Sequence, residues 1–327
     1  MYISEIKQEI IDNYKLKIPS MVWGMPGVGK SDLMRQVCDA LKITCKDERV
    51  PTLDPVDLRG VPSVENGYTL FNIPNLLPKV ERDGEHGIFF LDELPTAQPA
   101  MQAACYQLTL DRKIGDYTLP DGWVVAAAGN EVGHKAGAHR MLTALANRFG
   151  HYELEVNVEE WLQWGVQTGV DEDLLAFIKY RPALLQDKEM KGYAFASPRS
   201  WGNANKHRRF MTPQNEFNKI KAFVGESAAI EFNNFMKIVR ELPTIDEILK
   251  SPKTAKCPEK LDVVLATSAL LLKHVTLKNF STIMEYVDRI PEEFQAHFTT
   301  EAIKRDENIA DTKEYTAWAL ANSTKIF

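Results

Sequence analysis

The clearest chemical pattern in the sequence is a glycine-rich segment, Gly24-Met25-Pro26-Gly27-Val28-Gly29-Lys30-Ser31, which matches G-x-x-x-x-G-K-[ST] at every fixed position. Glycines in such a loop let backbone N–H groups turn inward around phosphate oxygens, and a following helix directs the positive end of its dipole at the same anion. Lys30 would then reach the β and γ phosphates, and the Ser31 hydroxyl would ligate magnesium. The segment therefore predicts a nucleoside triphosphate site. The alternative is a glycine turn without a ligand.

Two adjacent carboxylates, Asp92 and Glu93, follow a second apolar run, Ile88-Phe-Phe-Leu. Four apolar residues predict a buried strand, which we expect to lie beside the strand that precedes the glycine loop. Asp92 would then emerge at the carboxyl edge of the sheet as a magnesium ligand. Glu93 would polarise the attacking water as a general base. The alternative is a solvated strand end with no chemical role.

A polar amide, Asn130, follows a third apolar run, Val124–Gly129. At the end of a strand between the two earlier strand ends, this amide could hydrogen-bond the γ-phosphate or the lytic water. Asn after Gly is also an ordinary turn residue. The neighbouring motifs favour the functional interpretation.

Short apolar strands and amphipathic helices alternate in the first half of the chain. Apolar runs predict strands over 20–23, 87–91, 123–128 and 152–156, and helical spacing predicts helices over 2–14 and 30–41. Strands separated by helices indicate an α/β layered sheet that is parallel. The pair Asn66-Gly67, flanked by β-forming residues, predicts a hairpin inserted into this core.

Helical patterns dominate after residue 156. They cover 158–166, 171–180, 200–209, 217–224 and 227–240, and prolines at 243, 252 and 258 then mark a further helical stretch. The sequence thus predicts three parts: a core over 1–156 with an insert at about 53–72, a helical domain over 157–240 and a helical extension over 241–327.

Composition excludes several protein classes. With 327 residues, 44% of them hydrophobic, the chain can bury a full core. A net charge of −6 provides no overall basic field for nucleic acid or anionic membranes. Four scattered cysteines favour a reducing compartment over disulfides or zinc. No run approaches the roughly 20 apolar residues that span a bilayer, and the N-terminus lacks a secretory signal. We therefore expect a soluble, cytoplasmic protein without membrane partners.

Over residues 1–240 the sequence resembles the AAA+ ATPases, and within them the MoxR-type group and its dynein-related relatives. The resemblance rests on several motifs in a fixed order: the glycine loop as Walker A, residues 53–62 with the hairpin as the helix-2 insert, Ile88–Glu93 as Walker B, Asn130 as sensor 1, Leu145-Ala-Asn-Arg148-Phe149 as the arginine-finger segment, and Ala196-Ser-Pro-Arg199 as sensor 2. It implies an αβα P-loop NTPase sandwich, followed by a helical AAA+ lid and an α-helical C-terminal extension.

The resemblance also implies a homo-oligomeric ring, a hexamer, that binds ATP and Mg²⁺ between neighbouring subunits. Arg148 would be donated in trans, while Arg199 would reach the γ-phosphate from the lid. A planar, permanently charged guanidinium suits both tasks, because charge spreads over the phosphoryl oxygens as the bond breaks. Arg140 is a second candidate for the residue donated in trans.

Three functions compete at this point. The resemblance implies an ATP-driven chaperone that remodels protein clients and acts with partners bearing von Willebrand factor A domains. A nucleic-acid motor or restriction-type translocase is the alternative, and the acidic net charge counts against it. A GTPase switch is a third possibility, but no Asn-Lys-x-Asp or Thr-Lys-x-Asp element follows the glycine loop. We therefore expect an ATPase.

Overall fold

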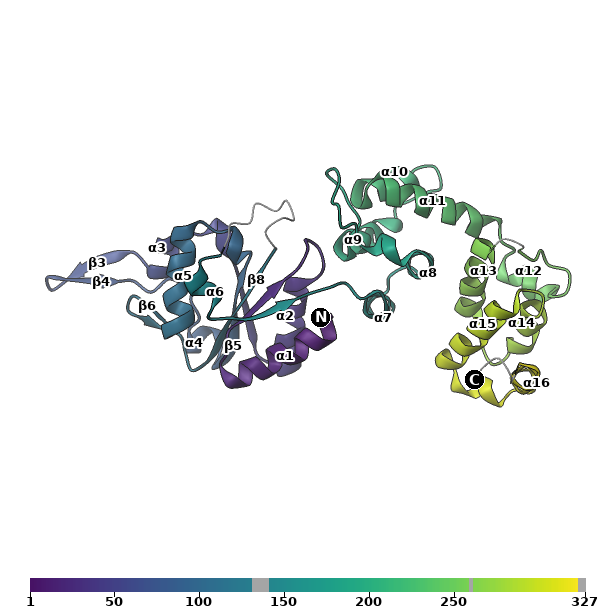
Figure 1. Cartoon of the computed structure of the whole chain (residues 1–327), viewed down its shortest axis with the longest axis horizontal. Coiled ribbons are helices and arrows are strands. Elements are labelled where there is room, and N and C mark those ends of the chain that lie inside the picture. Colours follow the sequence, from purple (N-terminus) through teal and green to yellow (C-terminus); the bar gives the residue numbers. More distant parts are fainter. Residues whose placement is uncertain (131–140, 259–260, 323–327) are drawn as a thin grey trace. The chain divides into compact units, whose positions relative to one another are not determined.

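The computed structural model describes residues 1–130, 141–258 and 261–322, and its contacts divide the chain into two compact units (Figure 1). The first, here the sheet unit, comprises Met1–Trp161 with Ser197–Ser200. The second, here the helical unit, comprises Leu162–Ala196 and Trp201–Phe327. Among the residues described, no helix is both long and apolar enough to span a bilayer.

The sheet unit is built on five parallel strands in the order β2-β5-β8-β1-β9. Their bounds are β1 Ser20–Trp23, β2 Thr44–Arg49, β5 His86–Asp92, β8 Gly122–Gly129 and β9 Gly150–Glu153. One prediction is wrong: β5 does not lie beside β1, because β8 pairs with both strands and separates them. The carboxyl ends of all five strands still meet at one edge of the sheet.

Both faces of the sheet are covered, which explains why its central strands are continuous apolar runs. Along β5, Phe89 and Leu91 belong to one hydrophobic cluster, whereas Ile88 and Phe90 belong to the other. Helices α1 (Ile3–Leu16) and α2 (Lys30–Leu41) pack on the second cluster, and α5 (Pro99–Asp111) and α6 (Thr143–Ala146) on the first. These layers and the helical region that follows confirm the predicted α/β fold class with a parallel sheet.

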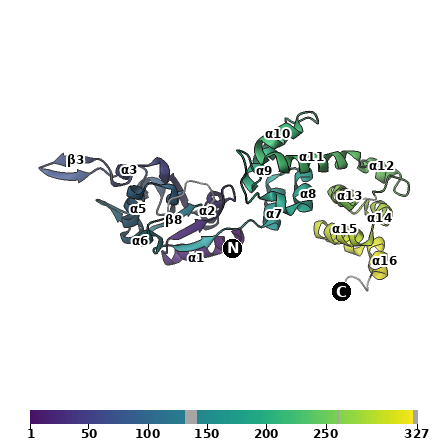
Figure 2. The ribbon, with the colours of Figure 1, turned by 45° about the horizontal axis from the view of Figure 1, so that its top comes forward.

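The predicted hairpin is present between β3 (Pro62–Glu65) and β4 (Tyr68–Phe71), directly after α3 (Pro55–Arg59). Asn66 and Gly67 form its turn with φ of 51° and 80°, the positive values that a two-residue hairpin turn requires. Figures 1 and 2 show the hairpin projecting away from the sheet. The remaining short elements of this unit are α4 Val80–Asp83, β6 Lys113–Ile114 and β7 Tyr117–Thr118.

The rest of the chain is helical, as predicted. Its helices are α7 Val158–Thr168, α8 Glu172–Tyr180, α9 Pro198–Arg208, α10 Glu216–Val224, α11 Glu226–Glu241, α12 Ile245–Lys250, α13 Leu261–His274, α14 Phe280–Val287, α15 Glu292–Arg305 and α16 Lys313–Ala321. An aromatic cluster of Phe177, Trp201 and Phe232 packs α8, α9 and α11 together. A second cluster packs α12 to α16. The division of this region at residue 240 stays a prediction.

The amino end of β5 depends on one glycine. A Cβ atom added to Gly87 would lie 2.6 Å from Cη2 of Trp123, whose indole is fully buried and donates to the Gly84 carbonyl oxygen at 3.0 Å. Gly87→Ala should therefore lower the free energy of unfolding by about 1–3 kcal/mol, the usual cost of overpacking. Urea unfolding followed by circular dichroism measures this loss.

Gly202→Ala is the matched control, because among the described residues a Cβ there meets only Cη2 of Trp164, at 3.7 Å. Alanine at this helical position should leave stability unchanged or raise it by up to about 1 kcal/mol. Equal stability of the Gly87→Ala variant and the unmodified protein would contradict the packing account.

Candidate functional site

The glycine loop connects β1 to α2 and has the backbone conformation of an anion cradle. Gly27 and Gly29 have φ of 79° and 104°, values that side-chain-bearing residues rarely adopt. A Cβ atom on Gly27 would also lie 2.7 Å from Ser197 Oγ. Gly29 caps the N-terminus of α2, where free N–H groups and the helix dipole favour a negative ligand.

The Lys30 ammonium group is held by three oxygen acceptors. Its Nζ donates to the carbonyl oxygens of Gly24 (2.7 Å) and Met25 (3.0 Å) and to Asn130 Oδ1 (2.7 Å). Burial lowers the Lys30 pKa to about 8, a shift that the Arg199 charge reinforces and the carboxylates of Asp92 and Glu93 oppose. The structure thus brings Asn130 to the loop. A half-buried cation of this kind is stabilised further by an anionic ligand.

Ser31 and Asp92 meet across the sheet edge. Ser31 Oγ donates to Asp92 Oδ2 at 3.0 Å, and Asp92 is buried, with only 7% of its surface exposed. The other carboxylate oxygen accepts the Glu93 backbone N–H at 3.0 Å. A hydroxyl and a carboxylate are the hard oxygen ligands that Mg²⁺ takes alongside substrate phosphates. These residues therefore fit a magnesium ion bound together with a nucleotide.

Glu93 is half-buried and has an unusual backbone. Its φ of 58° and ψ of 29° place it in the left-handed region. For a residue other than glycine, such a conformation costs on the order of 1–3 kcal/mol and is concentrated at functional sites. The chain turns sharply here from β5 into a short 3₁₀ turn, Leu94–Thr96. Glu93 therefore leaves the strand immediately beside the Asp92 carboxylate.

Arg199 lies against the glycine loop within the sheet unit. Its backbone N–H donates to the Gly27 carbonyl oxygen at 3.1 Å, and its side chain is exposed. Its positive charge is close enough to depress the Lys30 pKa. Two cations therefore face one loop, which favours a multiply charged anion between them.

Arg148 lies elsewhere, on the segment that follows α6. Its guanidinium donates to Tyr106 Oη on α5 and to the Ala144 carbonyl oxygen, and its Cζ lies 3.8 Å from the centroid of the Tyr106 ring. Within the described residues, its hydrogen bonds do not reach the glycine loop of its own chain. Arg140, the second candidate, lies outside the described residues.

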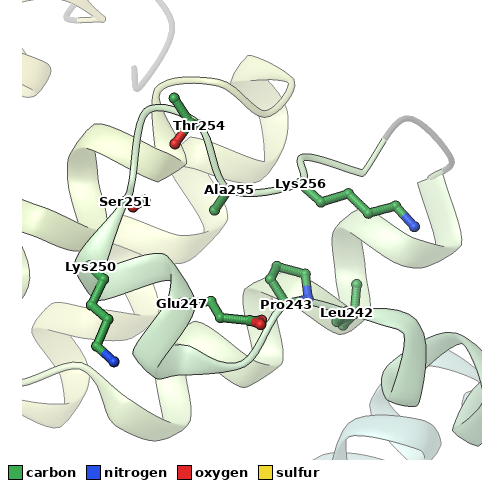
Figure 3. A pocket seen from close by; sticks show the side chains of 8 residues that line it. All are labelled: Leu242, Pro243, Glu247, Lys250, Ser251, Thr254, Ala255 and Lys256. Atoms are coloured by element: carbon green, nitrogen blue, oxygen red, sulfur yellow. The ribbon is translucent and has the colours of Figure 1, made fainter.

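A pocket of about 480 Å³ opens in the helical unit beside α12, and it contains no predicted site residue. Its lining residues are Leu242, Pro243, Glu247, Lys250, Ser251, Thr254, Ala255 and Lys256 (Figure 3). Figure 3 shows Glu247 directed toward Pro243, and its carboxylate accepts the Thr244 backbone N–H at 2.8 Å as part of the α12 cap. The Glu247 carboxylate therefore stabilises the N-terminus of α12.

Sequence reasoning missed Tyr106 and Ser197. Tyr106 is one apolar-face residue among many in α5, and Ser197 belongs to the Arg199 segment without a role of its own in the sequence pattern. Their proximity to Arg148 and Gly27 arises from tertiary packing. No spacing within the sequence signals either contact.

No family model and no curated protein matches the chain. Among solved structures, it is similar to a presumed ATPase from Cytophaga hutchinsonii at 13% identity, covering 92% of this chain and 79% of that one, with a TM-score of 0.39. It is also similar to the RuvB Holliday junction branch migration motor of Thermotoga maritima (18% identity, 77% and 75% coverage, TM-score 0.42). A third is NtrX from Brucella abortus in complex with ADP (13% identity, 98% and 67% coverage, TM-score 0.41).

The lowered pKa of Lys30 predicts how anion binding depends on pH. Below about pH 8 the ammonium is charged, and a bound polyphosphate should raise its pKa again. The affinity for ATP should therefore be constant below about pH 8 and then fall by up to about tenfold per pH unit. Isothermal titration calorimetry between pH 7 and 9.5 measures this. In Lys30→Arg, whose guanidinium stays charged, the fall should be absent; the same fall in both proteins would contradict the assignment.

Proposed function

We propose that the protein is a Mg²⁺-dependent ATPase of the AAA+ type. One observation carries this proposal: Lys30 with Asn130, and Ser31 with Asp92, are hydrogen-bonded at the same edge of the parallel sheet. A half-buried cation in a glycine loop and a hydroxyl–carboxylate pair for a metal are the two parts that phosphoryl transfer needs in one place. If these residues served only as surface salt bridges or helix caps, neither the positive φ angles of Gly27 and Gly29 nor the burial of Asp92 would be needed.

Each residue has a definite task in this proposal. Lys30 and Arg199 would neutralise the γ-phosphate, and Ser31 and Asp92 would hold Mg²⁺, which would supply positive charge to offset the negative charge of the phosphates. Glu93 takes a proton from the attacking water while the water oxygen forms a bond to the γ-phosphorus. The bond from that phosphorus to the bridging oxygen breaks, and ADP and phosphate result.

Glu93→Gln tests the base assignment. The amide cannot accept the proton, so turnover should fall about 10²- to 10⁴-fold, while the dissociation constant for ATP should change little because Lys30 and Ser31 are intact. Steady-state phosphate release and calorimetry measure the two quantities. Glu85→Gln, an exposed carboxylate before the amino end of β5, serves as the control and should retain activity. Normal turnover in Glu93→Gln would refute the role of Glu93.

We further propose that the sites are completed in a homo-oligomeric ring, a hexamer, in which Arg148 reaches the nucleotide of a neighbouring subunit. The placement of Arg148 supports this. Its guanidinium stacks on Tyr106 of its own chain rather than at its own glycine loop, so a role in catalysis requires a second subunit. Stacking on an aromatic ring also holds the side chain ordered before a partner arrives.

Mixed rings test donation in trans. Arg148→Ala alone should lose about 10³- to 10⁵-fold in turnover, as removal of an arginine finger does. Adding Lys30→Ala subunits, which cannot bind nucleotide but carry Arg148, should restore part of the phosphate release. Arg140→Ala in the same assay separates the two candidates. An Arg148→Ala protein that Lys30→Ala subunits never rescue would exclude Arg148 as the finger.

We also propose a role in remodelling protein clients, among them the partners with von Willebrand factor A domains that the family resemblance implies, and the exposed hairpin supports client binding. Val64 and Tyr68 are 76% and 74% exposed on a projecting β-ribbon. Apolar side chains in such a position commonly mark a protein interaction site. ATP hydrolysis in the core would then change the position of this ribbon on a bound client.

A further inference from the structure

His151 of β9 makes two hydrogen bonds that join separate parts of the sheet unit. Its Nδ1 accepts from Trp23 Nε1 at 2.8 Å, and its Nε2 lies 2.8 Å from the Ala146 carbonyl oxygen. Because a carbonyl oxygen only accepts and an indole N–H only donates, these partners assign a neutral ring with the proton on Nε2. Both ring nitrogens of His151 are therefore used.

Register explains why these side chains meet. Met21 of β1 is paired with His151 in the parallel ladder, so Trp23, two residues further, projects from the same face as His151. The two rings stack with centroids 5.9 Å apart and planes at 15°. Phe149 contacts the His151 ring edge-on at 6.4 Å. The hydrogen bonds are thus supported by ring packing on the α5 and α6 face.

The two partners of His151 lie beside the glycine loop and beside the segment that carries Arg148. Trp23 is the last residue of β1 and precedes Gly24, the first residue of the glycine loop. Ala146 ends α6, a helix of only four residues, and its carbonyl oxygen also accepts the Phe149 backbone N–H at 3.1 Å. So short a helix has few hydrogen bonds of its own, and external contacts hold it in place.

Resting on the proposed function, we propose that His151 is a positioning residue for Arg148. It fixes the end of α6 against the strand that enters the glycine loop, so that the Arg148 segment and the loop keep one geometry. Arg148 follows Ala146 by two residues, and its guanidinium rests on the Ala144 carbonyl oxygen of the same short helix. Movement of α6 relative to β1 would displace the guanidinium that a neighbouring subunit receives.

His151→Phe tests this role, because it keeps a ring for the stack and removes both hydrogen bonds. Turnover should fall on the order of 10- to 100-fold, the cost of a misplaced catalytic group, with the ATP dissociation constant unchanged. Trp23→Phe, which replaces the indole by a smaller ring without an N–H donor, should change turnover in the same direction. His86→Phe, an exposed histidine at the amino end of β5, is the control and should be normal.

Mixed rings give the decisive readout. Lys30→Ala subunits, with an intact His151 and Arg148, should restore turnover at the nucleotide sites of His151→Phe subunits. Arg148→Ala subunits should gain about 10- to 100-fold less turnover from His151→Phe neighbours than from Lys30→Ala neighbours, because the Arg148 that His151→Phe subunits donate is misplaced. Equal rescue by the two kinds of neighbour, unchanged turnover, or a parallel loss of ATP affinity would overturn the proposal.

Hydrogen exchange tests whether His151 holds the end of α6 in place, and it does not depend on ATP hydrolysis. In His151→Phe the amides of 143–149 should exchange faster than in the unmodified protein, while those of α2 should not change. This hydrogen-exchange experiment is valid whether or not the protein hydrolyses ATP. Absence of ATP hydrolysis would refute the proposed function but not the positioning role of His151. Unchanged exchange over 143–149 would show that His151 does not position this segment.

Discussion

The ammonium group of Lys30 sets the main constraint on the sheet unit. Lys30 is half-buried, the pKa of its ammonium group is lowered to about 8, and two main-chain carbonyl oxygens and the Asn130 amide hold that group. A charge in such a place needs compensation. The glycine loop, the strand ends around it and the nearby carboxylates of Asp92 and Glu93 supply this only in part, and a phosphate chain would complete it.

The strand order determines which side chains can share this edge. Because β8 lies between β1 and β5, Asn130 comes between the loop and the two carboxylates. The hydrogen bond from Ser31 to Asp92 nevertheless connects the start of α2 to the end of β5. The amide is therefore placed to contact both the loop cation and a ligand, and the carboxylates lie one strand further away.

Much of the core could be predicted from the sequence, because its signals are local. The bounds of β1 and α2 coincide with the apolar run and the helical spacing, and the Asn66-Gly67 turn is specified by two residues. Strand β2 was missed, because Thr-Cys-Lys-Asp-Glu-Arg has no apolar run and lies at the edge of the sheet. The prediction that β5 lies beside β1 was wrong, because strand order depends on crossover connections that no residue pattern encodes.

The candidate site likewise contains residues that could be predicted from the sequence and contacts that could not. Residues 24–31, Asp92, Glu93 and Asn130 are recognisable because they adjoin strand ends, whereas the stacking of Arg148 on Tyr106 and the link through His151 depend on side chains far apart in the sequence. Such contacts follow from packing of α5 and α6 on one face of the sheet that includes β9. Only the tertiary structure reveals them.

The most direct test is a structure of the full chain with Mg²⁺ and a non-hydrolysable ATP analogue. Lys30 Nζ should then contact the β and γ phosphates, having given up at least one of its present acceptors, and the metal ion should lie on Ser31 Oγ beside the Asp92 carboxylate. A nucleotide bound elsewhere, with the Lys30 hydrogen bonds to Gly24, Met25 and Asn130 all intact, would contradict the central claim.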